Sequence, residues 1–126
     1  MQISLNWAKY LGRFMKDTLF LLSPGFNDGE GAPYYCPACT IFEGLLHLYP
    51  QLAEQIEVHR VDFPRPRPQI IALIGEENQS CPVLVLGTPS KGTDLNIKRS
   101  GARQFIDDPQ AIGHYLSEAY GIPRPH

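Results

Sequence analysis

Short apolar segments separated by prolines and glycines constrain the fold of this chain more than any other feature. The 126 residues include 12 prolines and 11 glycines, and 43% of them are hydrophobic, which is enough to form a core. Apolar spacing predicts seven elements. In chain order they are a strand at 18–22, a helix at 39–49, a strand at 56–61, a short helix at 69–75, strands at 83–86 and 95–98, and a helix at 109–120. A βαβ unit followed by two strands and a helix predicts one α/β domain.

Residues 1–16 differ in composition from the domain expected at residues 17–126. They contain basic residues but no acidic one, and apolar residues recur at helical spacing at Ile3, Trp7, Leu11 and Phe14. This pattern predicts an amphipathic helix. Three interpretations stay open: an accessory helix packed on the domain, a translated upstream extension with Met15 as the natural start, and a targeting or membrane-surface helix.

The composition argues against several classes of protein. A net charge of −2 gives no polyelectrolyte character, so nucleic acid is not an expected partner. No apolar run approaches the roughly 20 residues that cross a bilayer, so no membrane partner is expected. The cysteine count of 3 is odd, which argues against a secreted disulfide scaffold. We expect a cytoplasmic protein that is a monomer or a homodimer.

The motif Cys36-Pro37-Ala38-Cys39 carries most of the chemical information in the chain. The Cys-x-x-Cys spacing serves thiol redox couples and also forms half of many zinc sites. No second Cys-x-x-Cys and no His-x-x-x-His follows, which removes the usual four-ligand zinc frameworks. We expect Cys36 at the N-cap of the first helix and Pro37 at the first helical position, where the missing N–H costs nothing.

The two cysteines of the motif are expected to have different roles. Unpaired N–H groups and the positive end of the helix dipole favour the thiolate of Cys36, which makes it the expected nucleophile. Cys39 lies most of one turn further along, where it is placed to attack the mixed disulfide and release the substrate. This chemistry needs no bound cofactor.

The order of elements, with Cys-x-x-Cys between the first strand and the first helix, resembles the thioredoxin fold. Cys81-Pro82 falls where that fold carries its cis-proline. The resemblance covers residues 16–120 and implies a central mixed sheet of about four strands flanked by helices. Segments 82–86 and 105–116 also resemble the N-terminal domain of glutathione S-transferases. More closely, the chain is similar to a small bacterial family of thioredoxin-like proteins classed as a domain of unknown function, with a Tyr-Cys-x-x-Cys helix and a Gly-Glu-Glu-Asn-Gln-Ser block before the proline.

Proline directly after the first cysteine is the glutaredoxin arrangement, although Ala38 stands where glutaredoxins carry an aromatic residue. The resemblance therefore implies a thiol–disulfide oxidoreductase of glutaredoxin-like type, with glutathione as a possible co-substrate. Glutathione or a protein or peptide disulfide is the expected partner. The residues implied in binding substrate or glutathione are Tyr35, Cys81, Pro82, Asp107 and Asp108.

Two functions of other classes stay open. One is a non-catalytic thioredoxin-like module that binds glutathione or a partner. The other is a thiolate metal-binding protein that holds zinc or copper(I) through Cys36, Cys39 and Cys81. Cys81 itself has further interpretations, as an alternative resolving thiol or as a buried, inert small hydrophobe.

The aspartates before the last helix also have two interpretations. By resemblance to the transferases, Asp107 or Asp108 meets the γ-glutamyl amine of glutathione. Without a ligand, Asp108 before Pro109 is an ordinary helix N-cap.

The remaining polar and aromatic candidates divide in the same way. In the loop at 23–35, Asp28 and Glu30 either disfavour a nearby thiolate or are solvated. Tyr34 and Tyr35 either flank the dithiol or pin this loop to the core. We expect His47 and His59 to be structural or solvated rather than ligands. The stretch from Arg60 to Arg67 is expected to be a stiff solvated loop, with a docking strip for an acidic partner as the alternative.

Overall fold

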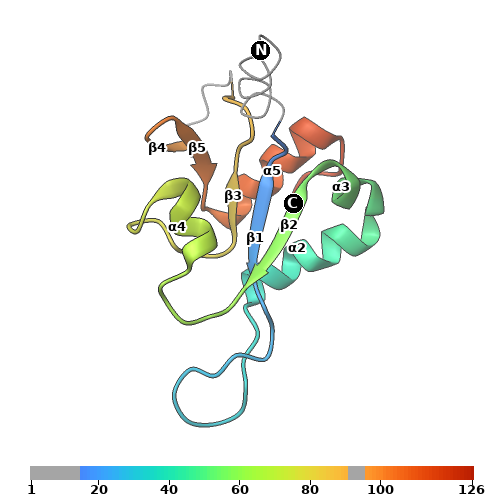
Figure 1. The fold of residues 1–126 in the computed structure, drawn as a ribbon. Helices are drawn as coiled ribbons and strands as arrows, with labels where there is room; N and C mark the ends of the chain where they lie inside the picture. The colour runs from blue at the N-terminus through green and yellow to red at the C-terminus, as the bar shows by residue number, and fades with distance from the viewer. Residues whose placement is uncertain (1–14, 91–95) are drawn as a thin grey trace, which may run out of the picture.

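The fold is of the α/β class: one mixed β-sheet carries helices on both faces (Figure 1). A computed structural model describes residues 15–90 and 96–126, so the helix predicted within 1–16 lies almost wholly outside the described residues. The elements are β1 (Thr18–Leu22), α2 (Pro37–Leu48), α3 (Pro50–Gln55), β2 (Glu57–Val61), α4 (Pro68–Ile74), β3 (Val83–Val85), β4 (Lys98–Ser100), β5 (Arg103–Ile106) and α5 (Pro109–Tyr120).

The sheet has five strands in the order β2-β1-β3-β5-β4, rather than about four. β1 and β2 are parallel, as the crossover through α2 and α3 requires. β3 is antiparallel to β1, and β5 is antiparallel to β3. The carboxyl end of β1, the start of β3 and the carboxyl end of β5 therefore meet at one end of the sheet. The motif cysteines lie at this end.

The sequence predicts a strand at 95–98 as the partner of the strand at 83–86, and this pairing is wrong. β5 pairs with β3 instead, and β4 pairs with β5 at the edge of the sheet. Phe105 and Ile106 of β5 are buried, whereas Lys98 and Arg99 of β4 are exposed. The apolar strand takes the inner position because that position is covered on both faces, and the charged strand is left at the edge.

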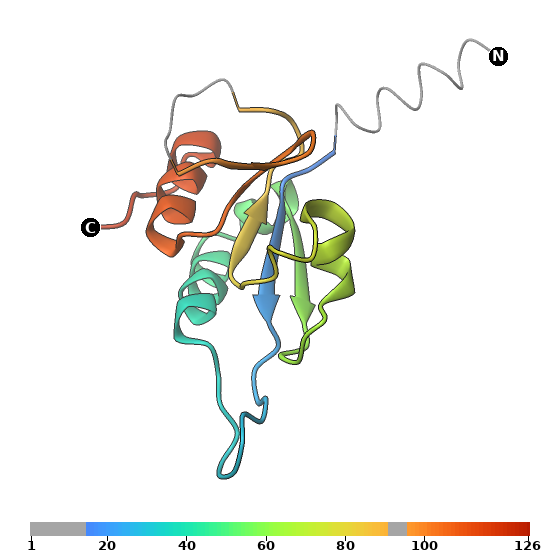
Figure 2. The same cartoon turned by 90° about the vertical axis from the view of Figure 1, so that its left-hand side faces the viewer.

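Helices cover the two faces of the sheet unequally. Figure 2 shows α2 and α5 on one face and α4 on the other. All five residues of β1 are consequently buried, which explains why that segment is a continuous apolar run rather than an alternating one. No helix in the described parts of the chain is long and apolar enough to cross a bilayer.

Proline occupies the first turn of α2, α3, α4 and α5. This position suits proline because the first N–H groups of a helix have no partner within it. Pro50 does end α2, as predicted, but it also begins α3, which the sequence analysis did not predict. Pro109–Tyr120 matches the prediction for the last helix, and Gly121 follows it in the left-handed conformation.

A buried carboxylate fastens the end of the sheet opposite the cysteines. Asp17 accepts hydrogen bonds from the Gly87 N–H, at 2.7 Å, and from the Tyr120 hydroxyl. Burial and the charge of Asp17 raise the pKa of Tyr115 to about 12, and burial and the bond to Asp17 raise the pKa of Tyr120 further. This cluster joins β1, the end of β3 and α5.

Candidate dithiol site

Cys36 is the N-cap residue of α2, as the sequence predicts. Its backbone is extended, with φ −82° and ψ 113°, and its Sγ accepts a hydrogen bond of 3.1 Å from the Cys39 N–H. The sulfur thereby partners one of the N–H groups that a helix start leaves free. Cys36 as a whole is partly exposed and lines a pocket at the surface.

Cys39 lies behind Cys36 and is buried, with 2% of its surface exposed. The Leu22 N–H, at the end of β1, donates to Cys39 Sγ over 3.4 Å. Burial raises the pKa of Cys39 from 9.0 to about 12, and the hydrogen bond with Cys36 acts in the same direction, while the Leu22 N–H opposes it. Cys39 is therefore a thiol at neutral pH.

Cys81 lies directly before β3 and is partly buried, and its peptide bond to the buried Pro82 is cis. Burial raises its pKa from 9.0 to about 11, against the opposing charge of Arg67. The charge of Cys36 raises the pKa of Cys81, and the charge of Cys81 raises that of Cys39. The three cysteines predicted from the sequence are thus near enough for their charges to influence one another, and all three are free.

A pocket of about 340 Å³ opens beside the dithiol. Its lining residues are Leu22, Pro24, Tyr35, Cys36, Cys39, Thr40 and Glu43. Arg60 of β2 donates to both carboxylate oxygens of Glu43, at 2.8 and 2.5 Å, and these bonds hold the pKa of Glu43 below its usual value. The Glu43 carboxylate at the pocket is therefore neutralised by the guanidinium of Arg60.

The loop at 23–35 extends beyond the end of the sheet (Figure 1). Phe26 and Tyr34 exchange backbone hydrogen bonds, and the Phe26 ring stacks on Phe63 at 4.4 Å between ring centres. Asp28 and Glu30 are exposed on this loop. The two tyrosines have separate roles, since Tyr34 closes the loop while Tyr35, 62% exposed, lines the dithiol pocket.

Asp107 and Asp108 follow β5, at the same end of the sheet as Pro82. Asp108 Oδ2 accepts a hydrogen bond of 2.9 Å from the Ala111 N–H, which makes Asp108 the N-cap of α5. Asp107 pairs with Lys98 of β4, with 2.9 Å between Nζ and Oδ1. Both carboxylates thus have partners within the protein.

Two of the four histidines, His47 and His59, were candidates in the sequence, and both lie in solvated positions. His47 is exposed in the last turn of α2, and His59 is exposed on β2, 3.0 Å from a carboxylate oxygen of Glu57. Within residues 15–90 and 96–126, no three side chains of histidine, cysteine, aspartate or glutamate form a group that could hold a metal ion.

Arg67 is the residue near the site that sequence reasoning missed. The stretch was expected to be a solvated loop, but Arg67 is 6% exposed and its guanidinium donates to the carbonyls of Phe63 and Gln79. Its positive charge also favours the thiolate of Cys81, against the effect of burial on that pKa. The alternation of arginine and proline hid this residue, because nothing in that pattern distinguishes Arg67 from the exposed Arg65.

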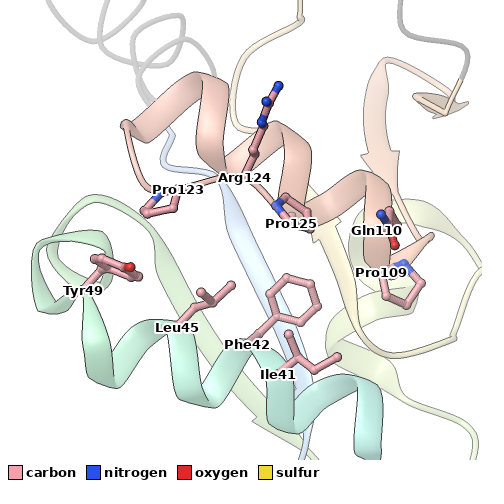
Figure 3. A pocket seen from close by; sticks show the side chains of 10 residues that line it. Ile41, Phe42, Leu45, Tyr49, Pro109, Gln110, Pro123, Arg124 and Pro125 are labelled. Atoms are coloured by element: carbon pink, nitrogen blue, oxygen red, sulfur yellow. The ribbon is translucent and has the colours of Figure 1, made fainter.

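A second cavity, of about 260 Å³, lies between α2, α5 and the C-terminal residues. Figure 3 shows Phe42 and Leu45 pointing from α2 toward this cavity, with Pro123 and Pro125 opposite them. No cysteine lines it. It belongs to the packing of the chain end rather than to the dithiol.

Residues 16–124 match the family described as "Protein of unknown function (DUF3088)". The chain belongs to this family. The match begins one residue before Asp17 and contains Cys36, Cys39 and Cys81. The dithiol site and the buried Asp17 cluster are therefore both within the DUF3088 domain. No curated protein and no solved structure matches the chain.

Proposed function

We propose that this DUF3088 domain is a thiol–disulfide oxidoreductase of glutaredoxin-like type on a thioredoxin-like fold. One observation carries the proposal: Cys36 caps the start of α2 with its sulfur partly exposed, and the buried Cys39 lies behind it. A reactive thiol needs access and a positive electrostatic environment, and the first turn of α2 supplies both.

The topology supports the thioredoxin-like assignment. A parallel pair joined through a helix is followed by antiparallel strands and a final helix, in the sheet order β2-β1-β3-β5. The Cys-x-x-Cys motif lies at the start of the helix after β1, and Pro82 directly precedes β3 at the same end of the sheet. These are the positions that the resemblance assigns to the nucleophile and to the proline that seats the substrate.

The reaction has two exchange steps. The Cys36 thiolate attacks one sulfur of a disulfide R–S–S–R′, the S–S bond breaks, and R′S⁻ leaves and takes up a proton. Cys39 then loses a proton to solvent and attacks the Cys36 sulfur of the mixed disulfide. A Cys36–Cys39 disulfide forms and RS⁻ leaves, so the substrate gains the two electrons that the dithiol loses.

The chemistry indicates the substrate class but not its identity. The pocket is open beside Cys36, with Tyr35 at its mouth, so it suits a small disulfide such as a glutathione mixed disulfide or an extended peptide disulfide. Three free thiols suit a reducing compartment, for which we propose the cytoplasm.

The test is reduction of a glutathionylated peptide by the purified chain with reduced glutathione as electron donor. We expect turnover by the wild type and none by Cys36→Ser, with unchanged circular dichroism. Glutathione binding without turnover would show a non-catalytic binding module instead. The absence of both turnover and glutathione binding would overturn the proposal.

A further inference from the structure

Arg67 places a buried positive charge near Cys81. The side chain is 6% exposed, and its guanidinium donates hydrogen bonds to the carbonyls of Phe63 and Gln79, at 3.0 and 2.6 Å. In the described part of the chain no carboxylate pairs with Arg67. A buried cation is costly unless an anionic group lies near it, and the nearby group that can become anionic is the Cys81 thiol, whose ionisation the charge of Arg67 favours.

Cys81 is also close to the nucleophile. β3 runs antiparallel to β1 with Val83 opposite Phe20, so Cys81 lies beside the end of β1. The end of β1 is where the Leu22 N–H holds Cys39, one helical turn from Cys36. Cys36 and Cys81 pack against the same core and are both partly exposed, whereas Cys39 is buried.

We propose that Cys81 is a second resolving thiol for mixed disulfides formed on Cys36, with Arg67 and Arg65 favouring its thiolate. This inference rests on the proposed function. In the step, Cys81 loses a proton to solvent and its sulfur attacks the Cys36 sulfur of Cys36–S–S–R. A Cys36–Cys81 disulfide forms, the bond to R breaks, and RS⁻ leaves and takes up a proton. The substrate disulfide is reduced and the two cysteines are oxidised.

The charges around Cys81 give the step an order. While Cys36 is a thiolate, its negative charge opposes ionisation of Cys81, whereas Arg67 and Arg65 favour it. Formation of the mixed disulfide removes the Cys36 charge and leaves both arginines in place. Cys81 therefore becomes more reactive after Cys36 has captured a substrate. The same step also removes the Cys36 charge that opposes ionisation of Cys39, but the buried Cys39 then has only the Leu22 N–H to favour its thiolate, whereas Cys81 has two arginines.

The decisive variant is Cys39→Ser, because serine can accept the hydrogen bond from Leu22 and leaves two cysteines. It is treated with glutathione disulfide without oxygen, quenched with acid, alkylated and mapped by peptide mass spectrometry. We expect a Cys36–Cys81 disulfide and release of both glutathione molecules. In the matched double variant Cys39→Ser/Cys81→Ser, glutathione should stay on Cys36, with release slowed at least about tenfold.

Substitution of the exposed Arg65 tests whether positive charge favours the Cys81 thiolate, and it disturbs no buried side chain. In Cys39→Ser/Arg65→Gln we expect release to slow about two- to threefold and its pH profile to move to higher pH, since a positive charge near Cys81 is lost. An unchanged rate and profile would overturn the role given to Arg65.

The outcomes separate the two proposals. A stable glutathione adduct on Cys36 of Cys39→Ser, with Cys81 still alkylated, overturns the role of Cys81 and leaves the proposed function standing. No adduct on Cys36 in any variant overturns both.

Discussion

The backbone N–H of Cys39 lies 3.1 Å from Sγ of Cys36, so the two motif cysteines are hydrogen-bonded without a disulfide. The bond partners the exposed sulfur with the helix start and leaves the other sulfur in the core. The two thiols of one motif therefore differ in access to solvent.

The first prediction concerns selective alkylation. Burial raises the pKa of Cys39 to about 12 and that of Cys81 to about 11, so both are thiols rather than thiolates at pH 7. We expect iodoacetamide to modify Cys36 at least about tenfold faster than either. Mass spectrometry of quenched samples measures the three rates. In urea the rates should converge, and equal rates in the native protein would contradict the prediction.

The second prediction concerns alkaline pH. Folding raises the pKa of Cys39 and Cys81 from 9.0 and that of Tyr115 from 10.0, so above pH 9 the unfolded chain releases protons that the folded chain keeps. This contribution to stability is complete below pH 9 and is lost progressively as the pH rises toward 11 to 12. Urea midpoints should therefore fall from pH 9 upward, and less steeply in Cys39→Ser. A midpoint constant to pH 11 would contradict it.

The third prediction distinguishes the two roles offered for Asp108. Asp108→Ala should lower the free energy of unfolding by about 1 kcal/mol, because the Ala111 N–H loses its cap. Asp108→Asn keeps a capping oxygen and should restore most of that loss. Denaturant unfolding measures both variants. If Asp108→Asn is stable but binds glutathione more weakly than the wild type, the γ-glutamyl interpretation is right.

The fourth prediction concerns the Glu43–Arg60 pair at the pocket rim. Both side chains are partly exposed, so Arg60→Ala should cost less than about 1 kcal/mol of stability. It should nevertheless slow the reaction of Cys36 with anionic glutathione disulfide about two- to fivefold at low salt, because Glu43 is no longer neutralised. Stopped-flow rates at low and high salt measure this. The neutral hydroxyethyl disulfide serves as control, and an equal loss with that reagent would show a structural effect.

The fifth prediction concerns the end of the sheet opposite the dithiol. A Cβ at Gly87 would lie 1.8 Å from the carbonyl oxygen of Met15, which is backbone and cannot move aside alone. Gly87→Ala should destabilise the protein by about 3 kcal/mol or more, since it also displaces the bond to Asp17. Thermal unfolding measures the loss. Gly44→Ala is the matched control, because its Cβ meets nothing within 4 Å.

Local signals were sufficient for much of this structure. The apolar run of β1, the capped helix Pro109–Tyr120 and the N-cap position of Cys36 depend on residues within one or two turns, and all three were predictable. Each is determined by its own side chains and by the neighbouring prolines and glycines.

The rest depended on contacts between distant segments. Burial on both faces of the sheet decides which segment lies beside β3, and no local pattern encodes that burial. The segment beside β3 is Arg103–Ile106 rather than 95–98. The burial of Arg67 depends on carbonyls of Phe63 and of Gln79, the second twelve residues away. Residues that acquire their role through such contacts include the arginine beside Cys81.

The hydrogen bonds between Phe26 and Tyr34 close the loop at its base, and Gly29 and Gly31 shape its tip with positive φ angles. The tip is thereby decoupled from the sulfur chemistry, although it projects next to the pocket that Tyr35 lines. Substitutions or insertions between Asn27 and Glu30 can accumulate without moving the dithiol. Related proteins can thus vary this segment while they keep the same dithiol geometry.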